Sequence, residues 1–240
     1  MEQPNTSREV LARMRRPESA ILGALLLVAG LVLMFLGLGE LVSRGATASF
    51  DEAVLSIFRT PGNPADPVGP AWFEEFMRDI TALGSFAGLG LLFLSVVFYL
   101  LIDGKRAAAL LMAVSVLGGT GISTLLKLGY DRPRPDIAET TRVFTASFPS
   151  GHAMLSAVTF LTLGVLLART RASHRLRVYF VSMAVLLTVL VGVSRIYLGV
   201  HFPTDVLAGW CVGAAWAGLC FAVMLWLQQR GRVEQPDDRD

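Results

Sequence analysis

The segment SRIYLGVHFPTD, residues 194–205, places an arginine, a histidine and an aspartate between two long apolar runs. The runs on either side, 178–193 and 206–227, approach or reach the length that a helix needs to cross a bilayer. Charged groups between such runs are expected at a membrane surface, because they are costly inside the hydrocarbon region. The segment therefore predicts two membrane helices joined at one face of the bilayer.

The composition of the whole chain extends this prediction. Of its 240 residues, 53% are hydrophobic and 17% are charged, and the mean hydropathy is +0.57; soluble proteins carry about a quarter charged residues. Windows of about 20 residues find six apolar stretches with few charges. These stretches run over 20–41, 84–102, 107–126, 153–168, 178–193 and 206–227. We expect an all-α, polytopic membrane protein, a six-transmembrane-helix bundle that forms one membrane domain over residues 1–240.

Lysine and arginine are concentrated in alternate segments outside these stretches, namely 8–16, 105–106, 169–177 and 230–239. By the positive-inside rule these segments face the cytoplasm. Residues 1–19 and 228–240 are therefore predicted as cytoplasmic tails. The short loops favour a bacterial inner membrane, with the polar residues of 127–205 on its periplasmic or extracellular face.

The first outer loop, residues 42–83, contains the sequence SFDEAVLSIFRT. Within it Phe50, Val54, Ile57 and Phe58 recur at helical spacing. This spacing is typical of an amphipathic helix that lies in the membrane interface. Such a helix either anchors the loop against the spans or gates a lipid entrance.

Gly209, Gly213 and Ala217 recur every four residues along the last span, a spacing that lets helix backbones approach closely. Packing within one chain is favoured over a dimer seam, so a monomer or weak homodimer is expected. Cys211 and Cys220 lie in the same span at a separation of roughly 13 Å along the helix, too far for a disulfide. They are predicted to be apolar filler.

Three polar clusters share the predicted outer face. KLGYDRPRP (127–135) ends the third span, FPSGH (148–152) opens the fourth, and SRIYLGVHFPTD links the fifth and sixth. Taken singly, each cluster has an ordinary explanation: Lys127 and Arg195 can anchor helix ends at the interface, and a Pro-Ser pair can begin a helix. The combination of cations and histidines at one level has only Asp131, Asp136 and Asp205 to balance it, which indicates an anion site.

The types of these residues point to phosphate as the anion. Arginine forks match phosphate oxygens bidentately and lysine adds a point charge. A serine that begins a helix leaves the next N–H groups free for an anion, and a glycine lets a ligand approach the backbone. The predicted cradle consists of Lys127, Arg134, Ser150, Gly151 and Arg195.

Two histidines divide the chemistry of phosphoryl transfer. Asp205, four residues after His201, can accept a hydrogen bond from one ring nitrogen and leave the other unprotonated as a nucleophile. His152 has no such carboxylate in its motif and is free to protonate a leaving oxygen and then to activate water.

The arrangement K-x6-RP at 127–135, PSGH at 149–152 and SR-x5-H-x3-D at 194–205 resembles the three-part signature of the type 2 phosphatidic acid phosphatase superfamily, membrane branch. The resemblance implies a helical bundle, a phosphohistidine mechanism and no metal or other cofactor. It implies the same roles: phosphate binding by Lys127, Arg134, Ser150, Gly151 and Arg195, general acid and base chemistry by His152, nucleophilic attack by His201 and its orientation by Asp205.

A lipid phosphate in the bilayer is the expected partner, and a nucleic acid is not. Phosphatidic acid, phosphatidylglycerol phosphate, undecaprenyl diphosphate and lipid A phosphates fit a site at headgroup depth, and resemblance to bacterial relatives favours undecaprenyl diphosphate or phosphatidylglycerol phosphate. A phosphotransferase with the same site is an alternative that the motifs leave open. A lipid flippase is disfavoured because the middles of the spans lack ionisable groups. A soluble vanadate-dependent oxidase is disfavoured by the six spans.

Three further residues inside the motif segments have non-catalytic interpretations. Arg132 is expected to pair with Asp131 or Asp136 rather than to touch substrate. Tyr130 and Tyr197 are expected in the aromatic belt at the membrane interface.

Overall fold

The computed structural model describes residues 6–136, 146–171 and 173–231, which form eight helices and a two-stranded hairpin. In chain order the elements are α1 (Thr6–Ser43), α2 (Ala48–Ile57), β1 (Arg59–Thr60), β2 (Asn63–Pro67), α3 (Ala71–Ala82), α4 (Phe86–Ile102), α5 (Arg106–Gly129), α6 (Gly151–Arg169), α7 (His174–Tyr197) and α8 (Pro203–Gln229).

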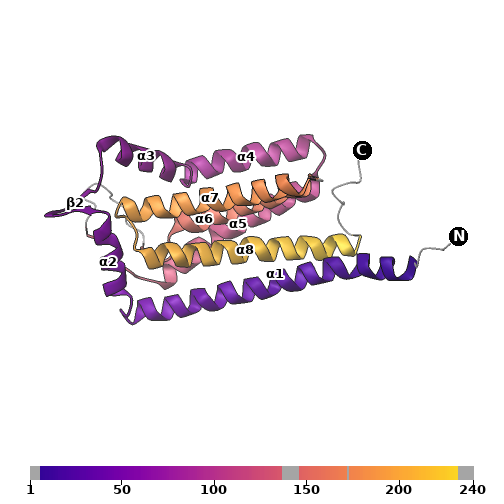
Figure 1. The fold of residues 1–240 in the computed structure, drawn as a ribbon, viewed down its shortest axis with the longest axis horizontal. Helices are drawn as coiled ribbons and strands as arrows, with labels where there is room; N and C mark the ends of the chain where they lie inside the picture. Colours follow the sequence, from indigo (N-terminus) through magenta and orange to yellow (C-terminus); the bar gives the residue numbers. More distant parts are fainter. Residues whose placement is uncertain (1–5, 137–145, 172, 232–240) are drawn as a thin grey trace.

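The long helices lie side by side in one bundle around α6 (Figure 1). Helix α6 packs against α5, α7 and α8, while α1 lies along α8 and α4 lies along α5. Met154, Ala157 and Val158 of α6 have no exposed surface, so the core of the bundle runs along this helix. Helix α1 begins and α8 ends at one end of the bundle, and α2, the hairpin and α3 lie at the other.

Within the part of the chain that the structure describes, five helices are long and apolar enough to cross a membrane: α1 from Glu18, α5, α6, α7 and α8. Helices α3 and α4 make a sixth span if they are taken together, although they are bent by 46° at the break between them. The predicted fold class, an all-α polytopic bundle, is confirmed. The predicted second span, 84–102, is α4 preceded by a helix that the sequence did not reveal. Residues 6–19 of the predicted cytoplasmic tail are helical and continuous with the first span.

The outward faces of these helices are apolar. Leu26 and Leu33 of α1 expose 66% and 69% of their surface, and Leu117 and Leu125 of α5 expose 61% and 69%. Such faces are unfavourable in water but match lipid chains, and the backbone polar groups are satisfied within each helix.

Small residues set the close approach of α8 to α6. A side chain at Gly209 would meet the Ser150 carbonyl oxygen, and one at Gly213 would meet the Met154 carbonyl oxygen and the Ala157 methyl group. The predicted role of this glycine pair in packing within the chain is therefore confirmed. Both cysteines are buried as free thiols.

The first outer loop contains more structure than the sequence predicted. The predicted helix over SFDEAVLSIFRT is α2, but Phe50 and Ile57 are exposed while Asp51 and Leu55 are buried. Its placement in the membrane interface stays a prediction, as does the division of the chain into tails, loop and catalytic region. The loop also forms the β1–β2 hairpin and the amphipathic α3, which packs on α7.

The interpretation of Tyr197 as a belt residue is wrong. Its side chain is 1% exposed, its hydroxyl donates to the carbonyl oxygen of Val68 at 2.9 Å, and its ring packs edge-on against Phe73 of α3. The outer loop folds over the end of α7 and takes Tyr197 out of contact with lipid.

Candidate active site

The three motif segments meet at the end of the bundle that carries α2 and the hairpin. The Ser150 N–H, just before α6, donates to the Asp205 carbonyl oxygen in the first turn of α8 at 2.9 Å. A side chain added to Gly151 would lie 3.2 Å from Lys127 Nζ at the end of α5. All eight residues predicted for the site belong to the helix ends and loops that converge here.

The loop between α7 and α8 carries His201. Gly199 turns the chain there with a φ of +69°, a left-handed conformation that other residues adopt at a cost. Helix α8 then begins with Pro203 in its first turn, where the missing N–H and fixed φ suit a helix start. The turn and the proline together fix the position of His201 relative to Asp205.

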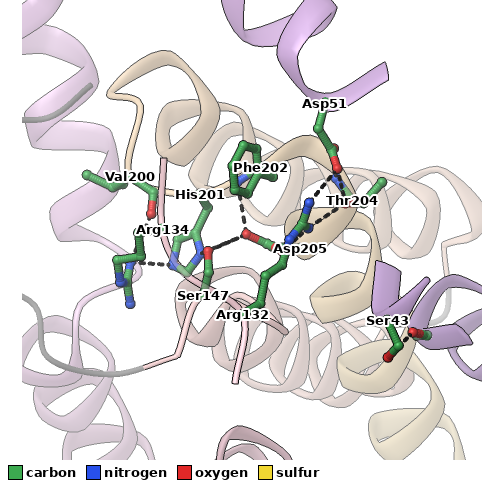
Figure 2. A network of polar contacts seen from close by, with 11 residues as sticks. Ser43, Asp51, Arg132, Arg134, Ser147, Val200, His201, Phe202, Thr204 and Asp205 are labelled. Carbon is green, nitrogen blue, oxygen red and sulfur yellow. Dashed lines mark hydrogen bonds and ion pairs between the residues drawn. The ribbon is translucent and has the colours of Figure 1, made fainter. Parts of the chain in front are cut away.

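The contacts of His201 define its neutral tautomer (Figure 2). Arg134 Nη1 lies 3.2 Å from His201 Nε2, and a guanidinium can only donate, so Nε2 presents its lone pair. The ring proton then sits on Nδ1, which lies 3.3 Å from Ser147 Oγ and 3.5 Å from Asp205 Oδ2. This assignment follows from the hydrogen-bond network, and it leaves Nε2 able to attack an electrophile.

Burial keeps His201 uncharged. The side chain is 1% exposed, and this burial lowers its pKa from the ordinary 6.5 to about 4, although the nearby Asp205 carboxylate opposes the shift. At neutral pH the imidazole therefore carries an available lone pair. A protonated ring could not act as a nucleophile.

Four donors converge on the buried carboxylate of Asp205. Oδ1 accepts from Arg132 Nη1 at 2.6 Å. Oδ2 accepts from Ser147 Oγ at 2.5 Å and from the Phe202 N–H at 2.9 Å, and it faces His201 Nδ1. The hydroxyl of Ser147 thus links the two, because it accepts from Nδ1 and donates to Oδ2.

The predicted cradle is cationic and partly unsatisfied. Lys127, Arg134 and Arg195 are close enough to His152 for their charges to act on it. Arg195 is 8% exposed and its Nη1 donates to Thr81 Oγ1 at 3.0 Å, but its Nε has no hydrogen-bond partner among the described residues. The fully buried Ser150 Oγ also lacks a partner there.

Such groups are costly to bury, at about 1–3 kcal/mol for each unmade hydrogen bond. Burial also lowers the pKa of Arg134, which Asp205 opposes. The first N–H groups of α6 add donors at its N-terminus, where the helix dipole favours an anion. An oxyanion would satisfy the orphaned donors and offset the excess of positive charge.

The site also contains residues outside the three motifs, around Asp205 and around Arg195. Ser147 lies just outside the PSGH motif, Thr81 belongs to α3, and Asp51 of α2 accepts from Arg132 Nη2 at 2.7 Å. The expected partners of Arg132 are corrected accordingly. It is paired as predicted, but with Asp205 and Asp51 rather than with Asp131 or Asp136, both of which are exposed.

Among residues 6–136, 146–171 and 173–231, no group of three or more His, Cys, Asp or Glu side chains is placed to hold a metal ion. The cradle instead consists of cationic side chains and backbone N–H groups. Independence of a metal or other cofactor stays a prediction.

Residues 108–229 match the family model of the PAP2 superfamily. The chain belongs to the PAP2 superfamily. The match contains all three motifs and the four helices α5–α8 almost completely.

This PAP2 protein is similar to several known proteins. It is 33% identical over 186 residues to phosphatidylglycerophosphatase B of Bacillus subtilis, covering 76% of this chain and 87% of that protein. It is 29% identical to lipid A 1-phosphatase of Rhizobium etli, over 66% of this chain and 75% of the relative. The crystal structure of a transmembrane PAP2-type phosphatidylglycerolphosphate phosphatase from Bacillus subtilis superposes with a TM-score of 0.72 at 30% identity, covering 82% of this chain and 94% of that one.

Proposed function

We propose that this PAP2 protein hydrolyses a phosphate ester of a membrane lipid through a phosphohistidine intermediate on His201. Family membership and similarity to lipid phosphatases make it a membrane-embedded lipid phosphate phosphatase. The proposal adds the mechanism, the residues that carry it, the substrate and the side of the membrane.

One observation carries the mechanism. The lone pair of His201 Nε2 lies beside Arg134 at the end of the bundle where the orphaned donors Ser150 Oγ and Arg195 Nε are buried. A phosphoryl group bound by these donors would bring phosphorus to the nucleophile. Lys127 and the N–H groups that open α6 would hold the remaining oxygens.

The reaction is proposed in two steps. His201 Nε2 attacks phosphorus, the bond from phosphorus to the lipid oxygen breaks, and His152 gives that oxygen a proton. His152 then takes a proton from water, the hydroxide attacks the phosphoryl group, and the P–N bond breaks to release inorganic phosphate and neutral His201. Asp205 and Ser147 stabilise the Nδ1–H that the ring needs throughout.

Phosphatidylglycerol phosphate is the substrate we propose first, because a relative that matches 76% of this chain at 33% identity is named for that activity. Its phosphate monoester would lie at headgroup depth, next to a site at the end of the bundle. From the distribution of basic residues, we assign this end of the bundle to the periplasmic or extracellular face. The opposite end, where α1 begins and α8 ends, is then cytoplasmic.

Phosphate release by the purified full-length protein tests the proposal. The panel comprises phosphatidylglycerol phosphate, undecaprenyl diphosphate, phosphatidic acid and a lipid A phosphate, each in the same detergent. We expect the highest kcat/KM on phosphatidylglycerol phosphate, no release by His201→Ala, and wild-type release by the matched control His174→Ala in the opposite loop. Wild-type protein that is folded yet releases phosphate from none of these lipids would contradict the function, and a preference for another lipid would contradict only the substrate.

A further inference from the structure

The buried carboxylate of Asp51 fastens α2 to the start of α8. Its Oδ1 accepts from the Thr204 N–H at 3.0 Å, and its Oδ2 accepts from Thr204 Oγ1 and Arg132 Nη2, both at 2.7 Å. The side chain is completely buried. An isolated carboxylate is very costly to bury, so these partners are what permit its position. The Thr204 N–H, which donates to Asp51, belongs to the first turn of α8, the helix that also carries Asp205.

Arg132 joins this carboxylate to the catalytic one (Figure 2). Its Nη2 donates to Asp51, while its Nη1 donates to Asp205 Oδ1 at 2.6 Å and to Thr204 Oγ1 at 2.8 Å. The guanidinium carbon lies 4.2 Å from the centre of the Phe202 ring, which covers one face of the group. The planar fork therefore has its geometry fixed on several sides.

The position of Arg132 between Asp51 and Asp205 has two consequences for Asp205. Because Arg132 occupies Oδ1, Oδ2 is left to face Ser147 and His201. Because Asp51 shares the single positive charge of Arg132, the three groups together keep a net negative charge beside the imidazole. With Asp51 neutral, the cation would be matched by Asp205 alone, and Asp205 would stabilise positive charge on His201 less well.

We propose that Asp51 and Arg132 are positioning residues for the nucleophile, acting through Asp205 to hold His201 in the tautomer with its proton on Nδ1. The inference rests on the proposed role of His201. It assigns to α2, outside the three motifs, a part in the chemistry as well as in packing.

Asp51→Asn is the informative variant, because the amide oxygen can still accept from the Thr204 N–H, while the charge is lost and an NH₂ group faces Arg132 Nη2 in place of the accepting oxygen. We expect kcat to fall about tenfold, as for one weakened hydrogen bond to a charged group, with KM changed by less than twofold. The matched control is Asp66→Asn, which removes another outer-loop carboxylate that accepts from a threonine hydroxyl, at 3.0 Å from Thr60 Oγ1. This control should keep wild-type kcat.

A double-mutant cycle separates positioning from simple stabilisation. If Asp51 acts through Asp205, the tenfold effect should shrink to less than twofold when Asp51→Asn is added to Asp205→Asn, because interacting residues are not additive. An undiminished tenfold effect in that background would overturn the inference. So would a loss of activity that only follows a loss of thermal stability.

A second measurement does not depend on turnover. The chain contains three histidines, so ¹⁵N-histidine NMR of the full protein, assigned with His152→Gln and His174→Gln, can read the tautomer of His201. We expect protonated Nδ1 in the wild type and a new population with protonated Nε2 in Asp51→Asn. Identical His201 signals in both proteins would overturn the inference even if phosphatase activity were established, and the expected shift would uphold the coupling even if no lipid were hydrolysed.

Discussion

Replacing Asp205 by asparagine removes a charge and cannot preserve the hydrogen bonds around it. The carboxylate accepts from Arg132 at Oδ1 and from Ser147 and the Phe202 N–H at Oδ2. An amide offers one oxygen and one NH₂ group. If the oxygen faces Phe202, the NH₂ group opposes the Arg132 guanidinium; if it faces Arg132, the NH₂ group opposes the Phe202 N–H and favours a His201 ring with its proton on the wrong nitrogen.

The expected loss of kcat can be worked out from the hydrogen bonds and the charge that Asp205→Asn removes. A lost hydrogen bond to a charged group costs about 1.5–3 kcal/mol. The carboxylate lies 3.5 Å from Nδ1, and at an effective dielectric constant of about 20 it attracts a cationic imidazole by roughly 5 kcal/mol. Because one orientation of the amide still accepts from Nδ1, we expect less than the full sum, a fall in kcat of about 10²–10⁴.

Rapid-quench kinetics on the purified variant should show that formation and hydrolysis of the phosphoenzyme are both slowed. KM should change little, since Asp205 does not belong to the phosphate cradle. The control is Asp103→Asn. In the wild type, the Asp103 carboxylate pairs with Lys105 between α4 and α5, at the far end of the bundle. A kcat for Asp205→Asn within threefold of the wild type would refute the orienting role, and so would an unchanged rate of phosphoenzyme formation.

The two histidines should differ: His201→Ala should abolish both turnover and the acid-labile adduct, whereas His152→Ala should slow turnover by about 10²–10⁴ and accumulate phosphoryl-His201 with p-nitrophenyl phosphate as substrate. An adduct on His152 would reverse the assignment. In intact cells a membrane-impermeant thiol reagent should label Asn63→Cys in the exposed β2 strand and leave Ser173→Cys before α7 unlabelled; the opposite pattern would invert the topology. Activity should survive EDTA and be blocked by vanadate, and a loss in EDTA that Mg²⁺ restores would show that the cationic cradle is incomplete without metal. Because the pKa of His201 is about 4 in the folded chain and 6.5 ordinarily, the unfolded chain binds more protons between these values, so stability should fall as the pH drops from 6.5 to 4. The melting temperature of the wild type should fall more over this range than that of His201→Gln, and parallel curves would argue against a neutral buried imidazole.

The sequence alone determined the membrane class and the residues of the candidate site. The free energy of transferring a segment from water to lipid depends on the composition of that segment alone. A sliding window of hydropathy is therefore enough to locate five of the spans. The closeness of His201 and Asp205 is also local, since the two residues lie on either side of the start of α8 in one short stretch of chain. The glycine spacing on α8 predicted close packing for the same reason.

Helix α3, which precedes α4 at a bend of 46°, was less accessible to these patterns. Helix α3 spans 12 residues and carries Glu74, Glu75, Arg78 and Asp79. A window that scores mean hydropathy rejects such a segment. The apolar side of α3 packs on α7, where the Phe73 ring meets the Tyr197 ring. This contact exists only in the folded bundle, so a local pattern cannot reveal it.

Only the tertiary structure decided which charges meet. Asp51 and Arg132 are separated by 81 positions, and Asp51 and Thr204 by 153. No periodicity or composition connects residues so far apart, and Arg132 has nearer acidic residues in Asp131 and Asp136. Burial determines which aspartates pair with Arg132. A carboxylate withdrawn from water needs a cation and hydrogen-bond donors, whereas an exposed aspartate is already solvated. The folding of α2 over the start of α8 supplies that burial and thereby selects the partner of Arg132.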